Sequence, residues 1–272
     1  MKKFLYYLTF ASLGFSCLAE QVTIEQVRAK WVAKLEEEER VLCAQAGISF
    51  EFLEKLRQAN DRADILQLTQ EHIGAELQGE LVGVLDLFLA GIASVLKISF
   101  EDRGGTRAEL DPCPEATIAR VKQILAGYLP EAKLNNLQLA VSKTMLIELN
   151  GAQYAALADM YDLVSNIIIL SPLLIGTDYP PALFEQMIIH EATHLKNSDV
   201  LTMQHFGPAY TRFCEKRADF MGVLLSSNPV EAAYDIREEK PFPYCYRGGP
   251  EWQELYQDVL QCVPTVSTQQ NQ

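Results

Sequence analysis

Positive charge is scarce in this sequence of 272 residues, and paired cysteine motifs and repeats are missing from it. Its 23 Lys and Arg stand against 36 Asp and Glu, which gives a formal net charge of −13. Binding to nucleic acid or to an anionic membrane surface by charge needs the opposite sign, so neither is expected as a partner. No Cys-X-X-Cys pair occurs, so the cysteines predict no zinc site of their own. No internal repeat is present, and the only low-complexity segment is the polar tail 265–272.

What the chain does contain is an ordinary globular mixture, 49% hydrophobic and 22% charged. A chain of this length forms one large domain or two small ones around a buried core. The segment 101–114 is rich in Gly, Asp and Pro and is typical of a loop and a domain boundary. We therefore expect a helical N-terminal region over 20–114 and a second domain over 115–264.

The first nineteen residues have the layout of a secretory signal peptide. Met1-Lys2-Lys3 is a basic start, Phe4–Leu18 is apolar, and Cys17 and Ala19 place small residues at positions −3 and −1 before Glu20. The expected location is the bacterial periplasm or cell envelope. Two alternatives stay open, an uncleaved N-terminal anchor and a lipid attached to Cys17.

Five cysteines remain after cleavage; Cys43 with Cys113 and Cys245 with Cys262 are plausible disulfides in an oxidising compartment, which leaves Cys214.

One apolar segment, 81–98, raises the question of a membrane span. Its length is at the lower limit for crossing a bilayer, and Asp86 lies inside it, where a charge is costly. A buried helix of a soluble protein is therefore the favoured interpretation, and membrane association is the alternative.

The order of expected elements is helices, then a small sheet, then helices, which predicts a mainly helical α+β fold. Helices are expected over 22–78, with Val27, Trp31 and Leu35 at helical spacing toward a core, and over 115–129. Strands are expected at Leu137–Val141, Met145–Leu149 and Asn166–Leu170, with a turn at Asn150-Gly151 and an ambiguous stretch over 152–165. Two further helices should begin near Pro181 and Pro208.

The chemistry of the chain is indicated by His190-Glu191-Ala192-Thr193-His194, an HExxH sequence on the first of these two helices. Residues four apart lie one turn above each other, so both imidazoles can bind one zinc ion. Glu191 is turned away from them and is placed to act as general base on the attacking water. The opposite side of the helix has an apolar stripe: Phe184, Ile188, Ala192 and Leu195. The plain alternative is a surface helix with two ordinary histidines.

The second helix supplies a third ligand. Glu215, Asp219 and Gly222 share one of its faces, and Cys214, Ala218, Met221 and Leu225 form the neighbouring apolar stripe. Glu215 completes a His-His-Glu set, and Asp219 can accept a hydrogen bond from the outer nitrogen of a histidine ligand. Gly222 would let the two helices approach closely. His205 is the alternative third ligand, and a solvated charged face is the alternative for Glu215 and Asp219.

The segments HEATHLKNSD and EKRADFMGVLL resemble the gluzincin peptidases that include the HtpX heat-shock proteases, the CAAX prenyl proteases and the periplasmic BepA-type proteases. The resemblance covers about residues 134–237. It implies a zincin-like metallopeptidase domain with one Zn²⁺ per chain on His190, His194 and Glu215, catalysis by Glu191 and support from Asp219. It also implies that an edge strand, in the region of Asn166–Leu170, pairs with an extended protein or peptide substrate.

Two departures from that family affect the expected activity. Thr193 stands where the family usually has Gly, and no histidine follows His205, although the family commonly has a His-Pro pair that stabilises the oxyanion. Tyr244, Tyr246 and Arg247 occupy roughly that place and could donate to an oxyanion. The leading hypothesis is a zinc endopeptidase of the cell envelope. The alternative is a non-catalytic zinc-binding chaperone or interaction module descended from such a peptidase.

Overall fold

The computed structural model is mainly helical with a small sheet, which confirms the predicted α+β class. It describes residues 22–46, 49–58, 67–68, 71, 110–143, 147–149, 152–154, 156–160, 166–175, 180–199, 207–238 and 249–262. The predicted signal peptide, the segment 81–98, Cys245, His205, and the proposed oxyanion donors Tyr244, Tyr246 and Arg247 lie outside these residues. Among the described helices, none combines the length and apolar character needed to cross a bilayer.

The order of elements follows the expectation of helices, sheet and helices. The described helices are α1 (Ile24–Gln45), α2 (Phe50–Gln58), α5 (Glu115–Leu125), α6 (Glu131–Asn135), α7 (Pro172–Ile175), α8 (Pro181–Lys196), α10 (Gly207–Leu225), α11 (Pro229–Glu238) and α12 (Pro250–Gln261). The strands are β1 (Leu110–Pro112), β2 (Leu137–Ser142), β3 (Ile147–Leu149), β4 (Ala152–Tyr154), β5 (Ala156–Met160) and β6 (Asn166–Leu170).

The main sheet has the strand order β1-β2-β6-β5. β6 pairs in parallel with β2 and antiparallel with β5, with Ile168 opposite both Leu139 and Ala158. β6 therefore has no free edge, and the expectation that substrate pairs along Asn166–Leu170 is wrong for this sheet. β5, which falls in the stretch that sequence patterns left ambiguous, is the edge strand next to β6 among the strands that the structure describes. A separate pair, β3 and β4, places Leu149 opposite Ala152 across the predicted turn.

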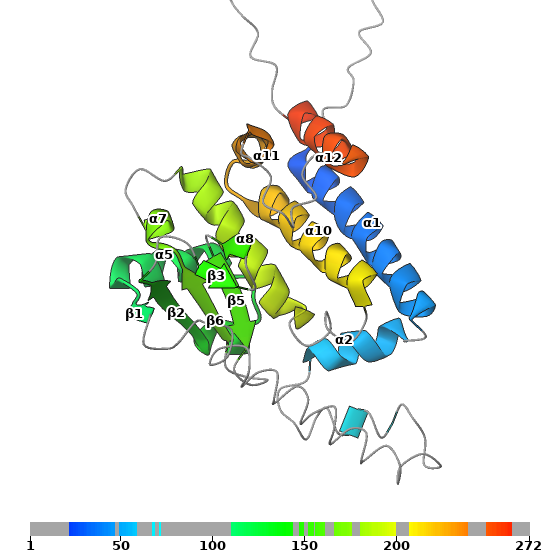
Figure 1. The fold of residues 1–272 in the computed structure, drawn as a ribbon. Coiled ribbons are helices and arrows are strands. Elements are labelled where there is room, and N and C mark those ends of the chain that lie inside the picture. The colour runs from blue at the N-terminus through cyan, green and yellow to red at the C-terminus, as the bar shows by residue number, and fades with distance from the viewer. Residues whose placement is uncertain are drawn as a thin grey trace, which may run out of the picture.

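Helix α8 lies between the sheet and α10 (Figure 1). The predicted stripe of Phe184, Ile188, Ala192 and Leu195 is buried, at 0–1% exposure, in a core shared with the strands and with α5. Ile168 and Leu170 of β6 and Val121 and Leu125 of α5 complete the centre of this core. One side of α8 is thus fixed against the sheet, which leaves its other side for α10.

The second core joins α1 to α10, α11 and α12. A capping box of Thr23 and Gln26 starts α1, and its buried stripe of Val27, Trp31 and Leu35 is the one predicted from helical spacing. Trp31 packs edge-on against Phe220 of α10, with ring centroids 5.1 Å apart. The N-terminal helix is therefore part of the body that carries the second half of the site.

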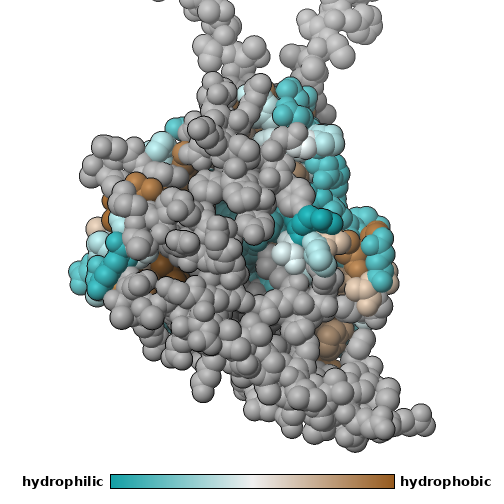
Figure 2. Space-filling view, viewed as in Figure 1, coloured by the Kyte–Doolittle hydropathy of each residue, from teal (hydrophilic) through white to brown (hydrophobic). Residues whose placement is uncertain are grey.

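The outer surface along α1 and α12 is mostly hydrophilic (Figure 2). Lys30 Nζ lies 2.7 Å from Asp258 Oδ2, and Lys34 Nζ lies 2.9 Å from Glu254 Oε2. Exposed pairs of this kind contribute about 0–1 kcal/mol each, so the buried stripe of α1 and not its charged face holds the two helices together.

Two further expectations need correction. The helix expected over 115–129 ends at Leu125, because Gly127 has φ +80°, a left-handed conformation that ends a helix readily at glycine. The disulfide between Cys43 and Cys113 is wrong, because the first belongs to the α1–α10 core and the second to the sheet core. Both are free thiols, as are Cys214 and Cys262, while Cys245, the partner expected for Cys262, lies outside the described residues.

Candidate metal centre

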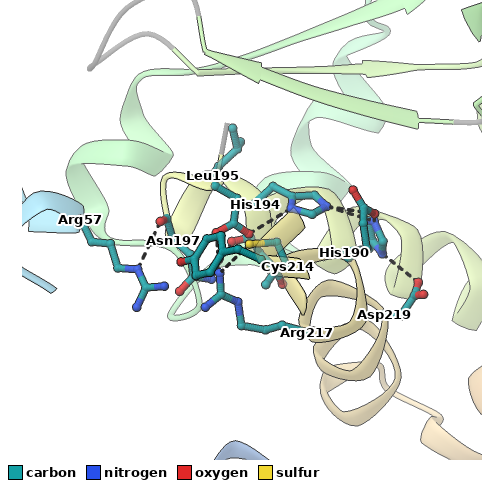
Figure 3. A network of polar contacts seen from close by, with 12 residues as sticks. Arg57, His190, His194, Leu195, Asn197, Cys214, Arg217 and Asp219 are labelled. Carbon is teal, nitrogen blue, oxygen red and sulfur yellow. Dashed lines mark hydrogen bonds and ion pairs between the residues drawn. The ribbon is translucent and has the colours of Figure 1, made fainter. Parts of the chain in front are cut away.

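The first two residues of the site project from α8 toward α10. Pro181 occupies the first turn of this helix, as predicted, and the sheet core fixes the rotation of the helix about its axis. His190 and His194 follow one turn apart, with ring centroids 4.9 Å apart and their Nε2 atoms 3.2 Å apart. Figure 3 shows the two imidazoles turned toward one another.

Glu215 on α10 completes a three-residue cluster. Its Oε2 lies 3.5 Å from His190 Nε2 and 3.7 Å from His194 Nε2. Its side chain keeps 28% exposure, against 13% and 9% for the two histidines, so solvent reaches the cluster on the Glu215 side. The structure thus brings together the three residues that the sequence placed on two separate helices.

The spacing of these three atoms fits a metal ion. A triangle with sides of 3.2, 3.5 and 3.7 Å has a centre about 2.0 Å from each corner, and zinc bonds to His nitrogen and carboxylate oxygen are about 2.0–2.2 Å long. Both Nδ1 atoms are occupied by carboxylates, so each neutral ring turns an Nε2 lone pair to the same point. The cluster can therefore hold a metal ion, and its donors do not by themselves select zinc over other divalent metals.

The same cluster perturbs its own acid–base equilibria. Burial lowers the pKa of His190, but hydrogen bonds to Asp219 and Glu215 outweigh it and raise the pKa to about 9. Burial also lowers the pKa of His194, but the charge of Glu215 and a hydrogen bond to Asp199 outweigh it and raise this pKa well above its usual value. Burial raises the pKa of Glu215, and the charges of the two histidines reverse this and hold it well below its usual range. Protons and a metal ion therefore compete for the same place.

Each histidine is oriented by a carboxylate on its outer nitrogen. Asp219 Oδ1 lies 3.0 Å from His190 Nδ1, in the position that the spacing on α10 predicted (Figure 3). Asp199 Oδ2 lies 3.0 Å from His194 Nδ1. Such carboxylates fix the tautomer and the ring orientation of metal-binding histidines. The sequence patterns on the two helices do not predict the position of Asp199 behind His194.

A turn at the end of α8 brings Asp199 back to His194. Asn197 caps the helix through bonds from its N–H to Thr193 O and Leu195 O, and Ser198 adopts φ 54°, in the left-handed region. Lys133 Nζ donates to Leu195 O at 2.6 Å and to Ser198 Oγ at 3.3 Å, so a cation closes the negative end of the helix. Burial lowers the pKa of Lys133 to about 8.

The closeness of α8 and α10 depends on Gly222. A Cβ atom added there would lie 2.7 Å from the backbone oxygen of Gln186, which is one turn before His190. That distance is well inside van der Waals contact, so the prediction that Gly222 permits a close approach of the two helices is confirmed. The approach keeps Glu215, on the same face of α10, within reach of both histidines.

Thr193, which departs from the resembled family, is accommodated by hydrogen bonds. Its hydroxyl donates to Ile189 O at 2.7 Å and lies 2.7 Å from Tyr128 Oη, so the tyrosine donates to it. Burial raises the pKa of Tyr128 to about 12, which keeps it a donor. A buried hydroxyl that both donates and accepts a hydrogen bond, as this one does, costs the fold little stability.

Glu191, the expected general base, is buried at 6% exposure next to the metal-binding residues on α8. Its charge contributes to the raised pKa of His190, which places it electrostatically close to the cluster. Its catalytic role stays a prediction.

Comparison with known proteins adds no further information. A scan against protein-family models, a search of curated proteins and a search of solved structures each returned no match.

Proposed function

We propose that this chain is a zinc-dependent endopeptidase with a zincin-like catalytic domain, acting on protein substrates in the cell envelope. The observation that supports it most is the convergence of His190 Nε2 and His194 Nε2 of α8 with Glu215 Oε2 of α10, at a spacing that fits zinc, with Glu191 on the same helix as the two histidines. The described residues offer two histidines and one carboxylate to the ion and no fourth ligand, and three protein ligands are typical of catalytic rather than structural zinc sites. The resemblance of HEATHLKNSD and EKRADFMGVLL to gluzincin peptidases points the same way.

Each residue of the site has a defined task in peptide hydrolysis. Zinc, when bound, lowers the pKa of water and polarises the scissile carbonyl. His190, His194 and Glu215 would hold the ion, while Asp219 and Asp199 fix the two imidazoles. Glu191 accepts the proton of the attacking water and passes it to the leaving amine.

The sheet offers a place for an extended substrate. β5 is an edge strand and packs against α8, the helix of the two histidines. An extended peptide can add to such an edge through main-chain hydrogen bonds, which bind many sequences with little dependence on side chains. We therefore propose β5, rather than Asn166–Leu170, as the strand that holds substrate.

Replacing Glu191 by Gln tests the assignment. The exchange keeps the shape of the side chain and removes the base. The variant should therefore keep its zinc, while its rate of peptide release from unfolded casein falls by about 10²–10⁴-fold. Glu185→Gln, the same change six residues earlier on α8, is the control and should match the wild type. Full activity of Glu191→Gln would show that the base is misassigned. A zinc-loaded wild type that hydrolyses none of a panel of unfolded proteins would instead support the non-catalytic zinc-binding module.

A further inference from the structure

The Asp199 carboxylate is shared between the metal centre and a buried arginine. Its Oδ2 lies 3.0 Å from His194 Nδ1, and its Oδ1 accepts a hydrogen bond from Arg217 Nη2. Asp199 is fully buried at 0% exposure and Arg217 is buried at 6%. Arg217 lies on α10, two residues after Glu215, and therefore on a different side of that helix from the ligand.

Arg217 is itself held by the N-terminal helix. Its Nη1 donates to Glu39 Oε1 of α1 at 2.6 Å, across 178 positions of sequence. Glu39 is buried at 3% exposure, and the same oxygen accepts from Tyr210 Oη at 2.8 Å and from Arg57 Nη2. Arg57 also reaches the end of α8 through a bond from its Nε to Asn197 O at 3.2 Å (Figure 3). A continuous buried chain thus runs from His194 through Asp199 and Arg217 to Glu39.

The two histidines differ in how their carboxylates are placed. Asp219 is in the middle of α10, where helical backbone fixes its position. Asp199 follows the turn at Ser198, outside the regular part of α8, so a second support has to determine where its carboxylate points. An arginine suits this task because its planar guanidinium donates in fixed directions to two carboxylates at once.

We infer that Arg217, held by Glu39, is a positioning residue of the metal centre: it fixes Asp199, which in turn holds the imidazole of His194 with Nε2 toward the ion. This inference rests on the proposed metal site. It makes the seating of α1 on α10 a condition for tight metal binding, although no residue of α1 touches the ion.

Metal affinity of single and paired variants tests this inference. The dissociation constants for Zn²⁺ and Co²⁺ would be measured by competition with a chromophoric chelator on the full chain, together with the visible absorption spectrum of the Co²⁺ form. Asp199→Asn and Arg217→Met should each weaken binding by about 10–100-fold and shift the Co²⁺ bands. Because both act through one contact, Arg217→Met in the Asp199→Asn protein should change affinity less than about twofold further.

A milder variant and a matched control remove the ambiguity of a misfolded protein. Glu39→Gln keeps the shape of the side chain and should weaken binding by a smaller factor, still with shifted Co²⁺ bands. Glu36→Gln removes the same charge from an exposed position on α1 and should equal the wild type.

Folded Arg217→Met and Glu39→Gln proteins with wild-type affinity and spectrum would overturn the inference, as would fully multiplicative losses in the paired variant. If Arg217→Met fails to fold, Glu39→Gln decides. A wild type that binds neither ion would overturn the proposed function, and the inference with it.

Discussion

Gly222 gives the sharpest test of how the two site helices are packed. Substitution by Ala adds a Cβ atom 2.7 Å from Gln186 O, and ordinary contact begins near 3.4 Å, so α8 and α10 must separate by about 0.7 Å. The atom that must yield belongs to helical backbone, which cannot rotate away as a side chain would. The same separation would lengthen the distances from Glu215 to both histidines, which are already 3.5 and 3.7 Å.

The sign of the stability change separates packing from helix propensity. Ala in place of Gly favours a helix by about 1 kcal/mol, while overfilling a packed interior costs about 1–3 kcal/mol. We expect Gly222→Ala to lower the free energy of unfolding by up to about 2 kcal/mol and to weaken zinc binding. Urea denaturation of metal-free protein and chelator competition measure the two effects.

A paired substitution checks which atom causes the loss. Gln186→Ala removes the side-chain atoms near Gly222 but leaves the backbone oxygen in place. The Gly222→Ala loss should therefore persist in the Gln186→Ala protein. If Gly222→Ala alone stabilised the protein by about 1 kcal/mol, as bare propensity would, the reasoning about close packing would be refuted.

Further predictions follow from the histidines and from the turn behind them. The pKa of His190 is raised to about 9, so this ring is protonated at pH 7 without metal, and zinc binding should release about one proton from it; calorimetry in buffers of different ionisation enthalpy measures this, and release of none would contradict the site. The folded pKa of His190, about 9, lies above its unfolded value of 6.5. The stability that the protonated ring adds to the metal-free protein is therefore fully present below pH 6.5 and should be lost as the pH rises toward 9. Urea denaturation midpoints measured across that pH range check this. Both Ser198→Val and Ser198→Gly lose the contact with Lys133, but Ser198→Val should be less stable than Ser198→Gly by about 1–2 kcal/mol, since a β-branched residue is strained at φ 54°; equal midpoints for the two would contradict the strained turn.

Periodicity and breakers predicted most of the elements that carry the site. Pro181 predicted the start of α8, and the apolar stripes with Phe184 and Ile188 on α8 and Ala218 on α10 predicted which faces are buried, because burial of an apolar stripe dominates helix orientation. The run Asn166–Leu170 gave β6 with its bounds correct. The helix expected to reach residue 129 ends at Leu125 instead, because the turn at Gly127 comes before the next helix breaker, Pro130.

The parts that sequence could not supply depend on contacts distant in the chain. Asp199 reaches His194 only because Ser198 adopts a left-handed conformation, and no local pattern marks that residue for it. Arg217 and Glu39 look like members of solvated charge runs, and it is the packing of α1 on α10 that buries them against each other. The place of β5 at the sheet edge likewise follows from pairing with β6, not from its own short sequence.

Zinc content of the purified protein tests the central claim most directly. The wild type should hold close to one zinc ion per chain after dialysis, Glu215→Ala should lose it, and His205→Ala should keep it. Loss of zinc in His205→Ala with retention in Glu215→Ala, or a wild type without zinc, would contradict the His190, His194 and Glu215 site.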